Sequence, residues 1–353
     1  MRLLILLLLA SALAGCSSGG DAPAADASSQ ARAVAPQAAG GTDCAGIHGN
    51  PPRPLSNSPT ALSDVPFQVL QACMLGGGEV LQWQDNAGEP RKACLYVPDN
   101  AAPETPLPLL TFLQGSVIPA DSQTLLSFLQ FINSSADLSG DPARPGTILL
   151  VPYGRDTQHY YPYPDDTGLG WDNWHRNFDR ADPQMNLDAA AIDHFIAEVQ
   201  ARGIVDPKRV YMSGWSNGAA MAILYGLNTP GIAATAVYSA HEAFSDIQDP
   251  CEQQPFGNNL RPIMTVHNDC DVIGICQTGG EGFRERLAAR MPGLEYRGVI
   301  IDALQQEVQA CQALCASQTI PATVANTGLL RHLTWPYLWT DRLFEFLRER
   351  PLP

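Results

Sequence analysis

The chain has 353 residues and a formal net charge of −15, from 36 acidic and 21 basic residues. Such an excess of negative charge repels phosphate backbones, so nucleic acid is not an expected partner. The length suits one large α/β domain or two smaller domains behind an N-terminal segment. No cofactor is implied by any motif.

The N-terminus has the features of an export signal. Met1 to Gly15 contains one Arg, a run of Leu and Ile, and then small residues. This pattern is typical of a signal peptide and is too short for a stable membrane span. The ending Leu13-Ala14-Gly15-Cys16 resembles the bacterial lipobox, in which the cysteine becomes the first mature residue and carries lipid. An ordinary signal peptide cut nearby, or an uncleaved anchor, is the alternative.

These features predict three segments: a lipoprotein signal peptide at 1–15, a lipid-anchored linker at 16–42, and a folded domain at 43–353. The linker is rich in Ala, Gly, Ser and Pro and cannot bury enough apolar surface to fold. The membrane is then a partner through Cys16. Ser17 after Cys16 resembles lipoproteins sent to the outer membrane, on its periplasmic or surface face; secretion is the other expectation.

Nine cysteines occur, and eight remain once Cys16 is set aside. An even number in an exported chain predicts disulfides, whose pairing the sequence leaves open. No pair has the C-x-x-C spacing of a zinc site. The later cysteines are expected to brace loops of the C-terminal half. The eight are Cys44, Cys73, Cys94, Cys251, Cys270, Cys276, Cys311 and Cys315.

Short apolar runs predict strands, and longer runs with helical spacing predict helices between them. The clearest helix is Asn186–Arg202, followed by Gly203, and another runs over Thr340–Arg350. Strands that are apolar throughout and alternate with helices indicate a mostly parallel sheet buried on both faces. The strands are expected at Leu107–Leu113, Thr147–Pro152, Arg209–Ser213, Ala234–Ser239, Pro262–His267 and Tyr296–Ile301.

The stretch YMSGWSNGAAMA contains G-x-S-x-G around Ser216, between a predicted strand and a predicted helix. A nucleophilic serine on a sharp strand-to-helix turn needs small residues two positions before and after it, and Gly214 and Gly218 meet that need. The N–H of Asn217, at the helix N-terminus, is then a donor for an oxyanion. The pattern predicts a nucleophile, against the plainer alternative of a serine helix cap.

A nucleophilic serine needs a base and an orienting acid, which α/β-hydrolases carry later in the chain in the order Ser, Asp or Glu, His. Asp269 and Asp271 both follow a predicted strand, and His332 precedes the C-terminal helix. The order Ser216, Asp271, His332 is therefore available. The run after Leu107–Leu113 offers the N–H of Ser116 as a second oxyanion donor.

The segment VDPKRVYMSGWSNGAAMA resembles the secreted esterases related to poly(3-hydroxybutyrate) depolymerases and feruloyl esterases. VHNDCD resembles their acid loop, His-Gly-x-x-Asp, and favours Asp271 over Asp269. RHLTWP resembles their base loop, Gly-His-x-Trp-Pro. The resemblance covers Pro106 to the C-terminus and implies an α/β-hydrolase fold and an ester-cleaving triad of Ser216, Asp271 and His332.

The sequence departs from that family at three points. Gln114 stands where the family has His. Two residues separate His332 from Trp335 where the family has one, so a strict match would make Leu333 the base. Leucine cannot accept a proton, and His332 with a one-residue insertion is the predicted base. The stretch 302–326 lengthens the path to this histidine, and covers the pocket or caps the domain.

A loop rich in Tyr, Trp, Pro and Gly precedes the long helix and should emerge at the carboxyl edge of the sheet, where ligands bind. Its aromatic side chains would stack on a sugar, an aromatic acid or a polyester; packing on one another is the alternative. Three acidic residues there suggest calcium but match no known loop, so no metal is predicted. The candidate substrate-binding residues are Tyr160, Trp171, Trp174, His241 and Trp335.

The predicted activity is hydrolysis of carboxylic esters through an acyl-enzyme. The expected substrate is a hydroxyalkanoate polyester or its oligomers, a feruloyl or acetyl ester on plant polysaccharide, or a small ester. Two alternatives stay open: a non-catalytic binding lipoprotein on a degenerate hydrolase fold, and a serine peptidase of the same fold.

Overall fold

The computed structural model describes residues 67–86, 88, 90–115, 137–154, 170–173, 178, 186–241, 259–271, 275–312, 328–332 and 334–353. The chain divides into two compact units, Met1–Gly41 and Thr42–Pro353, and all described residues belong to the second. The predicted signal peptide, lipidation site and linker lie outside the described residues. None of the helices in the described ranges is long and apolar enough to cross a membrane.

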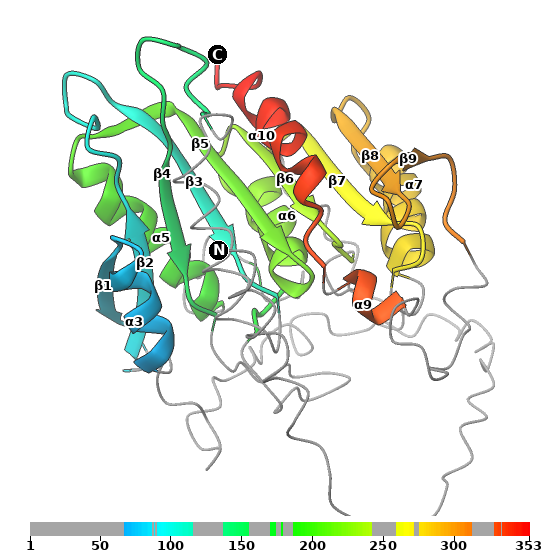
Figure 1. Cartoon of the computed structure of the whole chain (residues 1–353), viewed down its shortest axis with the longest axis horizontal. Coiled ribbons are helices and arrows are strands. Elements are labelled where there is room, and N and C mark those ends of the chain that lie inside the picture. Colours follow the sequence, from blue (N-terminus) through cyan, green and yellow to red (C-terminus); the bar gives the residue numbers. More distant parts are fainter. Residues whose placement is uncertain are drawn as a thin grey trace, which may run out of the picture. The chain divides into compact units, whose positions relative to one another are not determined.

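A nine-stranded sheet forms the centre of the described structure, in the order β1-β2-β4-β3-β5-β6-β7-β8-β9 (Figure 1). The pairings from β4 through β3 to β8 are parallel, and β1–β2, β2–β4 and β8–β9 are antiparallel. The strands are β1 Glu79–Gln84, β2 Pro90–Tyr96, β3 Leu107–Leu113, β4 Ile148–Pro152, β5 Val205–Trp215, β6 Ala234–Tyr238, β7 Ile263–Asn268, β8 Tyr296–Ile301 and β9 Glu307–Val308.

Every strand that the sequence predicted is present, with bounds shifted by at most a few residues. The strands that it missed are β1, β2 and β9, at the two ends of the sheet. Their segments carry charged and polar residues, as in EVLQWQ and PRKACLY. A strand with one face near solvent lacks the continuous apolar run by which the central strands are found.

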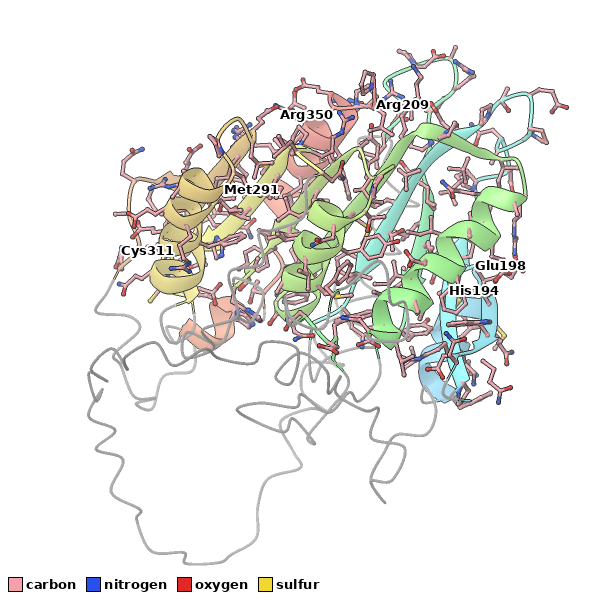
Figure 2. All side chains as sticks on the ribbon, turned by 180° about the vertical axis from the view of Figure 1, so that it is seen from behind. His194, Glu198, Arg209, Met291, Cys311 and Arg350 are labelled. Atoms are coloured by element: carbon pink, nitrogen blue, oxygen red, sulfur yellow. A yellow bond between two sulfur atoms is a disulfide. The ribbon has the colours of Figure 1, made fainter. Side chains whose placement is uncertain are left out.

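Helices cover both faces of the sheet. α5 (Leu187–Ala201), α6 (Asn217–Asn228) and α7 (Gly282–Arg290) lie on the face toward the viewer in Figure 2. α3 (Phe67–Leu75) and α10 (Thr340–Arg348) lie on the other face, in front in Figure 1. The short elements are η4 (Ile275–Glu281), α9 (Gly328–His332) and η6 (Tyr337–Trp339).

The central strands are apolar throughout because each supplies side chains to two cores. In β3, Leu107, Leu109 and Leu113 pack against the α5–α6–α7 side. Leu110 and Phe112 of the same strand pack on the α3–α10 side. The predicted fold class is confirmed: this is the α/β-hydrolase fold, a mostly parallel sheet with helices on both faces.

Disulfides brace the periphery of the sheet. Cys73–Cys94 joins α3 to β2, and Cys276–Cys311 joins η4 to the segment after β9. Cys270, beside the predicted acid, is also disulfide-bonded. The expectation that the later cysteines brace C-terminal loops is therefore confirmed for Cys276 and Cys311.

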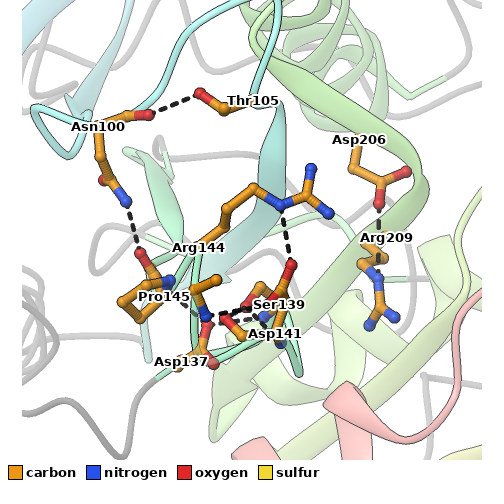
Figure 3. Close-up of polar contacts among 11 residues, drawn as sticks. Asn100, Thr105, Asp137, Ser139, Asp141, Arg144, Pro145, Asp206 and Arg209 are labelled. Carbon is orange, nitrogen blue, oxygen red and sulfur yellow. Dashed lines mark hydrogen bonds and ion pairs between the residues drawn. The ribbon is translucent and has the colours of Figure 1, made fainter.

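Local polar contacts hold the loops at the amino ends of β3 and β4 (Figure 3). Arg144 Nε donates to Asp141 at 2.9 Å, and Asn100 Nδ2 donates to the carbonyl of Pro145 at 2.8 Å. The Thr105 hydroxyl donates to the carbonyl of Asn100 at 3.0 Å. These contacts stabilise turns at the edge opposite the carboxyl ends of the strands, where open α/β sheets place their ligands.

Candidate active site

Three polar residues follow three neighbouring parallel strands. Ser216 comes directly after β5, Ser239 directly after β6, and Asp271 lies three residues beyond the end of β7. Since β5 pairs with β6 and β6 with β7, the carboxyl ends of these strands lie side by side. Adjacent strands are about 4.8 Å apart, so side chains at these ends are within reach of one another.

Ser216 has the backbone of a nucleophile elbow. It precedes α6 with φ 55° and ψ −122°, a backbone conformation that residues other than glycine rarely adopt. A Cβ on Gly214 would lie 2.5 Å from the carbonyl oxygen of Gly218, and one on Gly218 would overlap the backbone of Leu113 and Gln114. The turn therefore requires glycine at both positions for steric reasons.

A continuous chain of hydrogen bonds joins the predicted triad. Ser216 Oγ lies 2.8 Å from His332 Nε2, and His332 Nδ1 lies 2.7 Å from Asp271 Oδ1. A carboxylate only accepts, so Nδ1 carries the proton and Nε2 is free to accept the serine hydroxyl. Asp271 is 1% exposed and His332 is 9% exposed, so the bond between them is buried, whereas the bond from His332 to Ser216 is only partly buried.

The other acidic candidate, Asp269, binds the neighbour of the base. Arg331 Nη1 donates to Asp269 Oδ1 at 2.7 Å and to Asn268 Oδ1 at 3.2 Å. Burial raises the pKa of Asp269, and Arg331 acts against that rise through its charge and its hydrogen bond. Alternate residues of the acid loop thus hold consecutive residues of the base loop: Asp269 holds Arg331, and Asp271 holds His332.

Aromatic side chains also anchor the backbone of the base loop. Trp215 Nε1 donates to the carbonyl of His332 at 2.9 Å, and the Tyr238 hydroxyl donates to the carbonyl of Arg331 at 2.7 Å. Burial raises the pKa of Tyr238 well above its ordinary value, which keeps this hydroxyl a donor. At the start of α9, a Cβ on Gly328 would overlap the carbonyl oxygen of Cys270, so α9 packs directly on the acid loop.

Trp335 packs against the two aromatic residues that anchor this base loop. Its ring makes edge contacts with Phe112, Trp215 and Tyr238, with centroids 5.7–5.9 Å apart. It is 4% exposed, and its Nε1 donates to the Thr340 hydroxyl at 2.9 Å. The prediction that Trp335 binds substrate is not supported, because the side chain is enclosed by its own core.

Trp171 is also a core residue. It is 1% exposed, its Nε1 donates to the carbonyl of Gln114 at 2.9 Å, and its backbone N–H donates to Asn217 Oδ1 at 2.7 Å. This placement does not support substrate stacking. It shows instead how Gln114, which replaces the expected His, is held: its main chain is bonded to an indole.

Of the other three predicted substrate residues, His241 alone falls within the described ranges. Tyr160 and Trp174 lie outside the described residues. His241 is half-buried, and its backbone packs closely on Gly279, where an added Cβ would lie 2.9 Å from His241 Cα. Asp172 donates its N–H to Asp188 at 2.7 Å. Among the described residues, no group of three His, Cys, Asp or Glu side chains is arranged to hold a metal.

One oxyanion donor has a defined position. Asn217 is the first residue of α6, so its N–H has no intrahelical carbonyl to bind and lies beside Ser216. A Cβ on Gly115 would be 3.3 Å from Ser216 Cβ, so the chain leaving β3 passes directly against the nucleophile. Ser116, the second predicted donor, lies outside the described residues and stays a prediction.

Sequence reasoning missed Ser239. Its hydroxyl lies 2.7 Å from His332 Nδ1 and donates to Asp271 Oδ2. The available signal was a serine at the end of an apolar strand, ATAVYS, at the carboxyl edge that also carries Ser216. Arg331 was missed as well, since nothing in the sequence shows that it faces Asp269.

Replacing Arg331 by Met should lower the free energy of unfolding by about 1–3 kcal/mol, because the buried carboxylate of Asp269 loses its charged donor. The double variant Asp269→Asn/Arg331→Met removes the stranded charge as well and should recover part of that loss. Urea unfolding of the wild type and the three variants, including Asp269→Asn alone, measures both effects. Strictly additive losses would contradict the coupling.

His267 should make the protein less stable in mild acid. Burial lowers the pKa of this histidine, whose Nε2 donates to the carbonyl of Ala240 at 2.6 Å. Below the unfolded-state pKa of about 6.5, the unfolded chain binds a proton that the folded chain does not. Stability present above that pH is therefore lost as pH falls, by up to about 1.4 kcal/mol per unit until the folded pKa is reached.

Unfolding of the wild type and His267→Gln between pH 7.5 and pH 5 checks this expectation. The difference between their unfolding free energies should narrow as pH falls, since the variant lacks the titrating group. A difference that stays constant over this range would contradict it.

No family model and no curated protein matches the chain. Solved structures that are similar to this chain include a thermostable esterase, with 16% sequence identity and a TM-score of 0.47. The match covers 78% of this chain and 63% of that one. The chain thus spans less than two thirds of that esterase's length.

An S-formylglutathione hydrolase from Agrobacterium tumefaciens has 11% identity, a TM-score of 0.48, and coverage of 78% of this chain and 96% of its own. A hyperthermophilic esterase from Pyrobaculum calidifontis has 12% identity, a TM-score of 0.45, and coverage of 80% and 90%. At TM-scores below 0.5 these likenesses carry no functional assignment.

Proposed function

We propose that this chain is a serine hydrolase that cleaves carboxylic esters. The single observation that carries the proposal is the unbroken chain of hydrogen bonds from Asp271 through His332 to Ser216. The strained φ of Ser216 adds support, since backbone strain of this kind persists at sites where function requires it.

In the proposed reaction, Ser216 Oγ attacks the ester carbonyl as its proton passes to His332 Nε2. The N–H of Asn217 stabilises the oxyanion of the tetrahedral intermediate, and Asp271 stabilises the imidazolium. Collapse of the intermediate breaks the C–O bond, and the leaving alkoxide takes the proton from Nε2. Water, deprotonated by His332, then attacks the acyl-enzyme; collapse of the second tetrahedral intermediate releases the acid, and His332 returns the proton to Ser216 Oγ.

For the substrate we propose a hydroxyalkanoate polyester or its oligomers, or a feruloyl or acetyl ester. The support is the sequence resemblance of the elbow, acid-loop and base-loop segments. Release of monomers from oligomeric hydroxybutyrate, of ferulate from its methyl ester, and of acetate from an acetylated sugar separates these classes. The class with the highest kcat/KM identifies the substrate.

The first test is hydrolysis of a short-chain p-nitrophenyl ester by the purified protein with its disulfides formed. Turnover that saturates with substrate supports the esterase. An absence of turnover in the folded protein would overturn it and favour the non-catalytic binding protein. Faster cleavage of a peptide p-nitroanilide than of the matching ester would favour the serine peptidase.

We also propose that the protein is anchored to a membrane by lipid on Cys16 and reaches the outer membrane or the medium as an exported lipoprotein. The support is the lipobox-like ending of the N-terminal apolar run. Mass spectrometry of the mature N-terminal peptide should find a lipid-modified cysteine. The variant Cys16→Ser should remain unlipidated, and an unmodified Cys16 in membranes containing the wild type would contradict the proposal.

A further inference from the structure

Ser239 occupies the position between the nucleophile and the acid. It follows β6, and its N–H donates to the carbonyl of Val266 in β7 at 2.8 Å. The preceding carbonyl, of Tyr238, accepts the N–H of Ser216 at 3.1 Å. The backbone around Ser239 is therefore tied to the strands on both sides.

The backbone of Ser239 is itself unusual. Its φ is 58°, in the left-handed region that residues other than glycine rarely adopt, and the residue is 0% exposed. A non-glycine residue in this conformation costs about 1–3 kcal/mol, and such strain clusters at functional sites. Glycine would satisfy the backbone here without that cost, so the conformation alone gives no reason for a serine side chain.

The side chain has a role that glycine could not fill. The Ser239 hydroxyl donates to Asp271 Oδ2, while Oδ1 of the same carboxylate binds His332 Nδ1 at 2.7 Å. Ser239 Oγ also lies 2.7 Å from His332 Nδ1. The hydroxyl has one proton, which goes to the carboxylate, so its oxygen lone pair faces the Nδ1–H.

We infer that Ser239 is a positioning residue that holds the Asp271 carboxylate and the His332 imidazole in the orientation that proton transfer from Ser216 requires. The hydroxyl prevents rotation of the carboxylate about its Cβ–Cγ bond, and its oxygen shares the Nδ1–H with Asp271. The proton is thereby kept on Nδ1, and Nε2 stays free to accept. This inference rests on the proposed serine-hydrolase function.

Two variants remove the hydroxyl with different effects on the backbone. Ser239→Ala keeps the strain of a positive φ, whereas Ser239→Gly relieves it. If the alanine variant does not fold, the glycine variant still tests the loss of the hydroxyl. Both should lower kcat by about 10- to 100-fold, the range for losing a hydrogen bond to a charged group. KM should change by less than about 2-fold, since Ser239 does not contact substrate.

Ser213→Ala is the matched control. Ser213 is also a buried serine, on β5 three residues before the nucleophile. Its replacement should leave kcat within about 2-fold of the wild type. Thermal unfolding of every variant shows which of them are folded at the assay temperature.

The downfield proton NMR signal of the His332 Nδ1–H gives a readout that does not depend on turnover. Recorded in the Ser216→Ala background, this signal should be resolved with Ser239 present and should shift or broaden into exchange with water when Ser239 is Ala or Gly. A signal that does not change, or an unchanged kcat in an active enzyme, would overturn the inference. An inactive wild type with the expected NMR change would instead overturn the esterase and leave the positioning role standing.

Discussion

Replacing Ser216 by alanine should lower kcat for a p-nitrophenyl ester by about 10⁴- to 10⁶-fold, because the hydroxyl that forms the acyl-enzyme is lost and the neighbouring Ser239 is fully buried. His332→Ala should cost a similar factor, since Ser216 Oγ then loses its proton acceptor at 2.8 Å. The two residues act as one unit. The double variant Ser216→Ala/His332→Ala should therefore be no slower than either single variant.

Steady-state kinetics of the four proteins measures this cycle. The control is His194→Ala, a partly buried histidine on α5 whose ring stacks on Trp83 at 4.4 Å between centroids, and which Figure 2 shows at the β1 edge. It should retain full activity. Losses that multiply in the double variant would mean that Ser216 and His332 act independently, and would contradict the triad.

Gly218→Ala should destabilise the protein by more than about 3 kcal/mol, at or beyond the upper end of the range for overpacking. The added Cβ would overlap the backbone carbonyls of Leu113 and Gln114, neither of which can move without disturbing β3. The same shift would displace Gly115, which lies against Ser216, so activity should fall together with stability.

Gly282→Ala is the matched control, because Gly282 also lies in the first turn of a helix, α7. There the nearest atom to an added Cβ is the end of the flexible Arg286 side chain, at 3.2 Å, which can move away. This variant should gain up to about 1 kcal/mol from the helix propensity of alanine. Equal effects of the two substitutions in urea unfolding would contradict the steric account.

The sheet and the elbow were predictable because their signals are local. Leu107–Leu113 reads as a strand since it is buried on both faces, and the structure gives it the same bounds. Gly214 and Gly218 predicted the elbow at Ser216, because a tight turn excludes side chains two residues on either side. β1 and β2 were missed because a strand at the end of the sheet can carry charges.

Residue types and chain order determined the fold class and the candidates Ser216 and His332, and the family resemblance favoured Asp271 over Asp269 as the acid. Only the tertiary structure decided how they are held: Asp271 pairs with a histidine 61 positions away, which in turn reaches a serine 116 positions from it. It also showed that Asp269 pairs with Arg331 and that Trp171 and Trp335 are buried in the core. These contacts depend on which strand ends lie side by side, and no local pattern in a sequence encodes the distance between residues so far apart in the chain.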